Sequence, residues 1–178
     1  MKITISATFV ATALWLLTSA QAVSASPQWA CLESSLDDQF AVQFDLQDQI
    51  AEMVSEAQPE LTEFATLSAS VAKQNLEMTQ ELYAWIWETD PSRLDTFEAF
   101  KNFSWNDADR AAWVADNPNA AAMQDGLDDL NEQVSTHADQ NSFYTFLSLD
   151  AQQTAFHQLI EVAGQRADTA MNSAADCY

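Results

Sequence analysis

The chain has 178 residues, of which 27 are Asp or Glu and only six are Lys or Arg, so its formal net charge at pH 7 is −21. This charge argues against nucleic-acid binding, because contacts with phosphate need a basic surface, and it disfavours an anionic membrane surface for the same reason. Strong acidity is instead compatible with solubility at high salt, with cation binding, or with docking to a basic partner.

The first 25 residues have the pattern of a secretory signal peptide. Lys2 precedes an apolar stretch, 3–17, and small residues then provide A-x-A-like cleavage sites after Ala22 or after Ala25. The apolar stretch has about 15 residues, fewer than the roughly 20 that a membrane-spanning helix needs. We therefore expect export to the periplasm or the extracellular space, no stable membrane anchor after cleavage, and one acidic domain over 26–178.

The two cysteines, Cys31 and Cys177, lie near the two ends of the expected mature chain. In an oxidising compartment, an even pair predicts one disulfide bond. Closing a loop of about 146 residues would stabilise the fold by roughly 5 kcal/mol on the chain-entropy model. The alternative is that both cysteines remain free thiols. The spacing of the two cysteines excludes a C-x-x-C redox site.

Two long stretches with helical periodicity predict a hairpin of helices. The stretch 61–87 places apolar residues three or four positions apart and contains neither Gly nor Pro. The stretch 29–58 also has a broad apolar face. Opposite that face lie the acidic residues Asp45, Asp48, Glu52 and Glu56. Between the two stretches, Pro59 predicts either a tight turn, which gives an antiparallel hairpin, or a sharp kink within one bent helix.

Shorter helices are expected after the hairpin. Asp90 and Asn117 each precede a proline, which is the pattern of an N-cap followed by the first helical residue. Asp90 therefore begins a short third segment, and Asn117 begins a longer helix that continues to His137. Between them, Ser104 is expected to cap a fourth, short helix, because an acidic residue follows three positions later.

The last part of the chain predicts one more long helix. Residues 139–142 are expected to form a polar connection, and 143–147 a short apolar stretch of undefined type. Ser148 is expected to cap a final helix that extends to Ala174. No strand pattern of any length appears in the mature chain. The sequence therefore predicts an all-α, single-domain antiparallel helical bundle of about five or six helices, built on the long hairpin.

Clustered acidic side chains make a divalent cation a candidate ligand. Four of them lie on one predicted helix: Asp125, Asp128, Asp129 and Glu132. His157 lies four residues before Glu161, a spacing that puts both side chains on one helix face, as a metal pair requires. Calcium usually binds oxygens that converge from a loop, and no D-x-D-x-D-G loop is present. We therefore expect at most a loosely bound cation, and no other cofactor.

Aromatic residues are dense between Tyr83 and Trp113. They are expected either to fill the core or to form a pocket or a partner-binding hot spot. Trp85 continues the apolar stripe of its helix, whereas Trp87 turns away from that stripe. Trp87 is therefore the first candidate for a partner-binding residue, together with Trp105 and Trp113.

No arrangement of residues typical of catalysis is present. The sequence has no G-x-S-x-G elbow, no H-E-x-x-H motif and no glycine-rich phosphate loop. Export, strong acidity and the lack of such motifs predict a non-catalytic binding protein, adaptor- or chaperone-like, for a protein or peptide partner. A divalent-cation-binding or cation-sensing protein is the alternative, and an enzyme of unknown reaction comes third.

Overall fold

The computed structural model describes residues 27–178, and the predicted signal peptide, 1–25, lies outside the described residues. This part of the chain is helical and contains no strand, so the all-α prediction is confirmed. Its elements are α1 (Trp29–Ala57), η1 (Pro59–Leu61), α2 (Thr62–Thr89), η2 (Pro91–Leu94), α3 (Phe97–Lys101), α4 (Asp107–Asp116), α5 (Pro118–Thr136), α6 (Gln140–Leu147), α7 (Asp150–Ser173) and η3 (Ala174–Cys177). The apolar stretch of undefined type, 143–147, belongs to helix α6.

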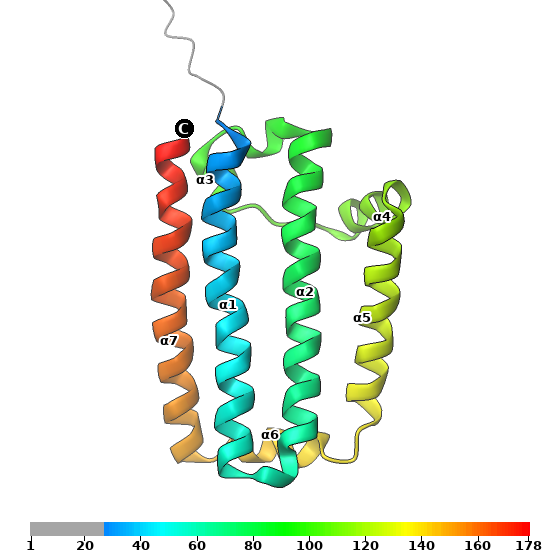
Figure 1. Ribbon diagram of the computed structural model, residues 1–178, viewed down its shortest axis with the longest axis vertical. Helices are drawn as coiled ribbons and strands as arrows, with labels where there is room; N and C mark the ends of the chain where they lie inside the picture. Colours follow the sequence, from blue (N-terminus) through cyan, green and yellow to red (C-terminus); the bar gives the residue numbers. More distant parts are fainter. Residues whose placement is uncertain (1–26) are drawn as a thin grey trace, which may run out of the picture.

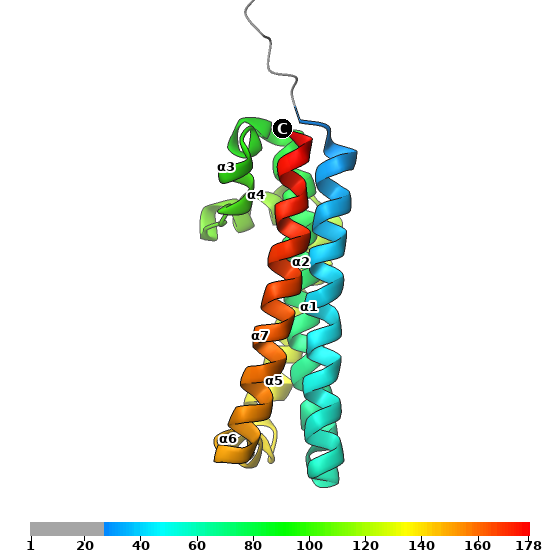
Figure 2. The same ribbon diagram turned by 90° about the vertical axis from the view of Figure 1, so that its left-hand side faces the viewer.

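The four long helices stand side by side in the order α7, α1, α2, α5, and each runs antiparallel to its neighbour (Figure 1). Helix α1 packs against both α2 and α7, and α2 carries α5 on its other side. Helices α3 and α4 lie to one side of this row at one end, as the turned view in Figure 2 shows, and α6 crosses the opposite end. Helices α5 and α7 are therefore the two edges of an open row.

Pro59 produces a turn between α1 and α2. Gln58 leaves the helical region, with φ −142° and ψ 82°, because a proline clashes with a helical residue before it. Pro59 then begins η1, and α2 begins at Thr62. Of the two alternatives, the chain adopts the turn, and the two longest helices form the antiparallel hairpin.

Asparagine side chains cap α4 and α5. The Asn106 side chain accepts hydrogen bonds from the backbone N–H groups of Ala108 and Asp109, at 2.9 and 3.0 Å, while the Asp109 carboxylate accepts one from the Asn106 N–H at 3.0 Å. This reciprocal pair is a capping box. The predicted cap at Ser104 is wrong, because Asn106 supplies the cap two residues later. The predicted cap at Asn117 is confirmed.

Ser148 closes α6 and does not cap α7. Its backbone N–H donates to the carbonyls of Tyr144 and Thr145, and its hydroxyl donates to Thr145 O at 2.6 Å. Leu149, with φ −70° and ψ 136°, occupies the N-cap position of α7. The predicted N-cap at Ser148 is therefore wrong. The predicted polar connection 139–142 is shorter than expected, because α6 already begins at Gln140.

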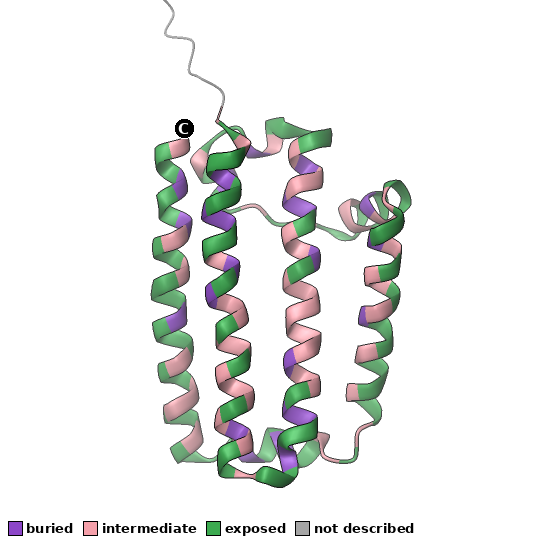
Figure 3. Cartoon of the chain, in the orientation of Figure 1, coloured by how far each residue is buried: buried purple, intermediate pink, exposed green. Residues whose placement is uncertain are grey.

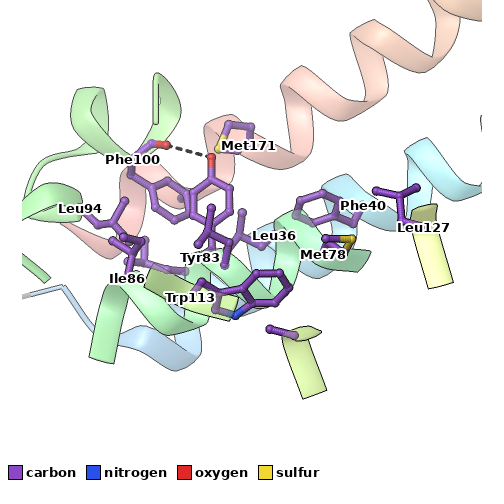
Figure 4. Close-up of a cluster of buried hydrophobic side chains, with 14 residues drawn as sticks. Leu36, Phe40, Met78, Tyr83, Ile86, Leu94, Phe100, Trp113, Leu127 and Met171 are labelled. Carbon is purple, nitrogen blue, oxygen red and sulfur yellow. Dashed lines mark hydrogen bonds between the residues drawn. The ribbon is translucent and has the colours of Figure 1, made fainter. Parts of the chain in front are cut away.

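Two clusters of buried side chains hold the row together, one toward each end. The larger one contains the fully buried Phe100 and Trp113 and lies where α3 and α4 cover the row. Figure 4 shows its residue Tyr83, whose hydroxyl donates to the Phe100 carbonyl at 3.4 Å. The smaller cluster, near the hairpin turn and α6, consists of Val54, Leu61, Phe64, Ala65, Phe143 and Phe146.

The middle of the row has a thinner core than its ends. In α1 no residue between Val42 and Val54 is fully buried, and in α2 none between Ala69 and Met78 is (Figure 3). The Asn75 side chain in this stretch donates to the carbonyl of Val71 in its own helix, at 3.0 Å, and so adds no bond between helices. Apolar burial therefore anchors the long helices chiefly near their ends.

A disulfide joins Cys31 to Cys177, as the sequence predicts, with their Cα atoms 5.8 Å apart. It links the start of α1 to η3, just beyond the end of α7 (Figure 1). Next to it, the hydroxyls of Ser35 and Ser173 are hydrogen-bonded at 2.9 Å. Helix α7 is therefore fastened to α1 at this end of the row.

Candidate functional site

Two open hollows lie end to end along the seam between α1 and α7. Their volumes are about 820 Å³ and 810 Å³, and Val162 lines both. We call the surface they form the acidic groove. Its carboxylates are Asp38, Asp45, Glu52 and Glu56, and its larger apolar side chains are Val42, Met53, Leu159 and Val162.

The spacing of residues in α1 explains the acidic wall of the groove. Asp38, Asp45 and Glu52 are seven residues apart, and Glu56 follows four residues later, so all four share one side of the helix. Most apolar core residues of α1, Leu32, Leu36, Phe40 and Val54, lie on its other side, where α2 packs, whereas Val42 lines the groove. The wall extends from Asp38 to Glu56, a separation of 18 positions or about 27 Å at 1.5 Å per residue.

Helix α7 exposes apolar side chains in the groove because it packs mainly against α1. Its core positions include Ala163, Met171 and the flanking Ala174, whereas Val162 points along the seam and is 56% exposed. Leu159, three residues earlier, is half-buried in the same groove. An edge helix has a neighbour on one side only, so its second apolar row remains open to solvent.

One basic side chain lines the groove. Arg166 of α7 reaches across the seam, with Nη1 3.2 Å from an Asp45 carboxylate oxygen that also accepts from Gln49 at 2.8 Å. Within residues 27–178, Asp38, Glu52 and Glu56 form neither hydrogen bonds nor ion pairs through their carboxylates. Four carboxylates facing one guanidinium leave this surface strongly negative.

The aromatic residues singled out by the sequence lie away from this groove and pair with one another. Trp87 is half-buried and stacks on Trp29, with ring centroids 5.5 Å apart. Trp105 is half-buried beneath the guanidinium of Arg110, which lies 4.5 Å from its ring centroid. Trp113 meets Trp105 edge to face and is fully buried, so it presents no surface to a partner in this fold.

The metal candidates are exposed and do not converge. Asp125, Asp128, Asp129 and Glu132 all project from α5 into solvent, and Asp128 accepts a hydrogen bond from Gln124. His157 and Glu161 are exposed on α7. Among residues 27–178, no group of three or more His, Cys, Asp or Glu side chains is placed to hold a metal ion.

The shifted pKa values belong to side chains that serve the fold. Hydrogen bonds from Arg93, at 2.7 and 3.0 Å, hold the pKa of Asp109 below its ordinary value, against the opposing effect of burial. Burial raises the pKa of Tyr83 to about 12. Neither Asp109 nor Tyr83 lines the acidic groove, and both contribute to packing around α3 and α4.

Sequence reasoning placed Asp45, Glu52 and Glu56 in the acidic row of α1, and all three line the groove. Asp48 of the same predicted row instead pairs with Lys73 of α2, and Asp38 was not included in it. The α7 side of the groove was missed. Val162 and Arg166 carry no motif, and the only available signal was a second apolar row beside the core positions of the last helix. That row becomes a surface only because α7 lies at an edge.

Comparisons of the chain with protein-family models, with curated proteins and with solved structures found no match. None of the helices within residues 27–178 is both long enough and apolar enough to cross a membrane. Function is therefore inferred from the surface of this chain.

Proposed function

We propose that this chain is an exported, non-catalytic binding protein that holds a protein or peptide partner in the acidic groove. The observation that carries the proposal is the position of Val162, which is 56% exposed in the middle of a groove lined by four carboxylates, of which only Asp45 has an ion-pair partner among residues 27–178. An apolar centre with a polar rim is the usual anatomy of a protein interface.

Export is supported by two independent features. The signal-like residues 1–25 predict secretion, and the bond between Cys31 and Cys177 suits an oxidising compartment. The aromatic residues and the groups with shifted pKa values lie outside the groove and contribute to the packing of the fold. Their position favours binding over catalysis as the function of the groove.

The proposal can be tested by selecting peptides from a random display library on the immobilised, oxidised mature protein. Selected peptides should lose affinity about tenfold or more for a Val162→Gln variant, because the apolar centre of the groove is gone. The matched control is Ile160→Gln, which alters another exposed apolar residue of α7, 42% exposed, that does not line the groove. Equal binding to both variants, or a library that yields no binder, would overturn the proposal.

A further inference from the structure

We infer that the partner segment of the acidic groove is a cationic amphipathic helix of about 18 residues, the length of the acidic wall. This inference rests on the proposed function and names the class of partner. Its evidence is the shape of the seam, the spacing of the carboxylates, and the difference between the two walls.

The shape of the groove favours a helix over an extended segment. The groove is the straight seam between two antiparallel helices, α1 and α7, and a third helix can pack into such a seam through its side-chain ridges. The backbones of α1 and α7 are hydrogen-bonded within their own helices, so they offer no row of free N–H and C=O groups to a strand. A helix satisfies its own backbone, whereas an extended segment would have to leave its polar groups to solvent.

The charge of the groove determines where the cations of the partner lie. Asp38, Asp45 and Glu52 repeat every seven residues, the interval at which a helix of two turns brings side chains back to one face. Lys or Arg residues at the same interval in the partner would face this row, as flanking charges do in paired helices. Asp38 and Glu52 have no partner of their own among the described residues, so both are free to pair.

The two walls of the groove differ in chemistry and so orient the partner. The α1 wall is acidic, whereas the α7 wall carries the neutral polar residues Gln158, Gln165 and Thr169 with the single Arg166. Between the walls lie the more buried Val42, Met53 and Leu159, and the exposed Val162 stands where the two hollows meet. A fitting helix therefore has an apolar stripe between the walls, a cationic row toward α1, and uncharged residues toward α7.

A second copy of this chain does not fit this description. The described residues hold all 27 acidic residues and only five basic ones, since Lys2 lies outside them. Two such chains repel each other at low ionic strength. The occupant is therefore a different molecule with positive charge.

The test uses the oxidised mature protein and synthetic labelled peptides of about 18 residues. The main probe is an amphipathic Lys/Leu/Ala/Gln helix with Lys on one side of its apolar stripe. The same residues in scrambled order test charge without amphipathicity. A peptide with the same charge and apolar content, but with prolines that prevent a helix, tests an extended binder. Affinity is measured by fluorescence anisotropy and peptide helicity by circular dichroism.

Two protein variants with equal charge localise the binding. The groove variant is Asp38→Asn/Glu52→Gln/Glu56→Gln, and the control is Asp125→Asn/Asp128→Asn/Asp129→Asn on α5. All six positions are exposed, and equal thermal midpoints will confirm that both variants fold. We expect the amphipathic helix to bind, to gain helicity, and to lose about tenfold or more of its affinity for the groove variant only.

The outcomes separate this inference from the proposed function. Equal weakening by both variants, or equal binding of the scrambled peptide, would show a non-specific attraction of cations and overturn the inference. Binding of the proline-containing peptide alone, with loss on Val162→Gln, would overturn the helical partner and keep the peptide-binding function. If neither the amphipathic helix nor any peptide of the random display library binds, both the helical partner and the proposed peptide-binding function are overturned.

Discussion

Cys31 and Cys177 are joined across a sequence separation of 146 residues, and this bond holds the edge helix α7 against α1. Elsewhere α7 buries few side chains fully, Ala163 and Met171 among them. The disulfide therefore holds α7 in place, an edge helix that buries few apolar side chains.

Replacing both cysteines, Cys31→Ser with Cys177→Ser, should lower the free energy of unfolding by about 5 kcal/mol, the chain-entropy value for so long a loop. Guanidinium titration measures the loss, and hydrogen exchange should show that amides in α7 lose protection before those in α2. The unreduced parent protein is the control. An unchanged unfolding midpoint would show that packing alone holds α7.

Trp113→Ala should lower the free energy of unfolding by about 3 to 5 kcal/mol, because the ring is fully buried in the larger core cluster and its loss leaves a cavity. Trp87→Ala should cost less, since that ring is only half-buried against Trp29. Denaturant titration compares the two variants. If Trp113→Ala is the milder change, the packing around α4 differs from that described.

Asp109→Asn should lower the free energy of unfolding by about 1 to 2 kcal/mol, because it removes the ion pair with Arg93 and weakens the capping box of α4. Asp107→Asn, which removes one charge from the same helix turn, is the matched control. An equal loss in both variants would mean that only charge near the helix start matters.

The contribution of Asp109 should also depend on pH in a defined direction. Its pKa is lowered in the folded state, mainly by the hydrogen bonds from Arg93, so the unfolded chain takes up the proton first as the solution becomes acidic. The stabilisation is present above about pH 4, the ordinary aspartate value, and is lost as the pH falls below it. The free energy difference between parent and Asp109→Asn, measured from pH 7 downwards by urea titration, should therefore shrink at acidic pH.

Two tyrosines should resist ionisation in alkaline solution. Burial raises the pKa of Tyr83 to about 12, and burial together with the negative charge of Asp95 raises that of Tyr178 to about 12. Because the folded pKa is the higher one, stability is lost as the pH rises from about 10, the ordinary tyrosine value, toward 12. Tyr83→Phe and Tyr178→Phe should each remove one late-titrating group, which spectrophotometric titration detects. Retention of both late-titrating groups in either variant would contradict the assignment.

Thermal unfolding in calcium, magnesium and sodium at matched ionic strength should give the same midpoint. The acidic residues of α5 are exposed and do not converge with other ligands within the described chain, so salt should act by screening alone. A site occupied at a hundredfold excess over its dissociation constant would instead add about 2.7 kcal/mol. A higher thermal midpoint in calcium alone would support the cation-binding alternative, and loss of that increase in Asp125→Asn would locate the site on α5.

The helices and the Cys31–Cys177 pairing could be predicted from the sequence, because they depend on local periodicity and on a count of two thiols. Proline geometry predicted a break at Pro59 but left a turn and a kink open, and the packing of α1 against α2 shows the turn. The same local rules misplaced two caps. Ser104 and Asn106 both suit an N-cap, and only the backbone hydrogen bonds of Asn106 and Asp109 decide between them.

The candidate site could be predicted only on its α1 side. Periodicity shows that Asp45 and Glu52 share a face opposite the apolar stripe, but it does not show which helix lies beside them. Only the tertiary structure places α7 there, leaves Val162 exposed at the edge of an open row, and buries Trp113 in the larger core cluster. The physical reason is that an apolar stripe specifies that a helix must be covered, whereas the packing of the whole chain decides which neighbour covers it and which row remains for a partner.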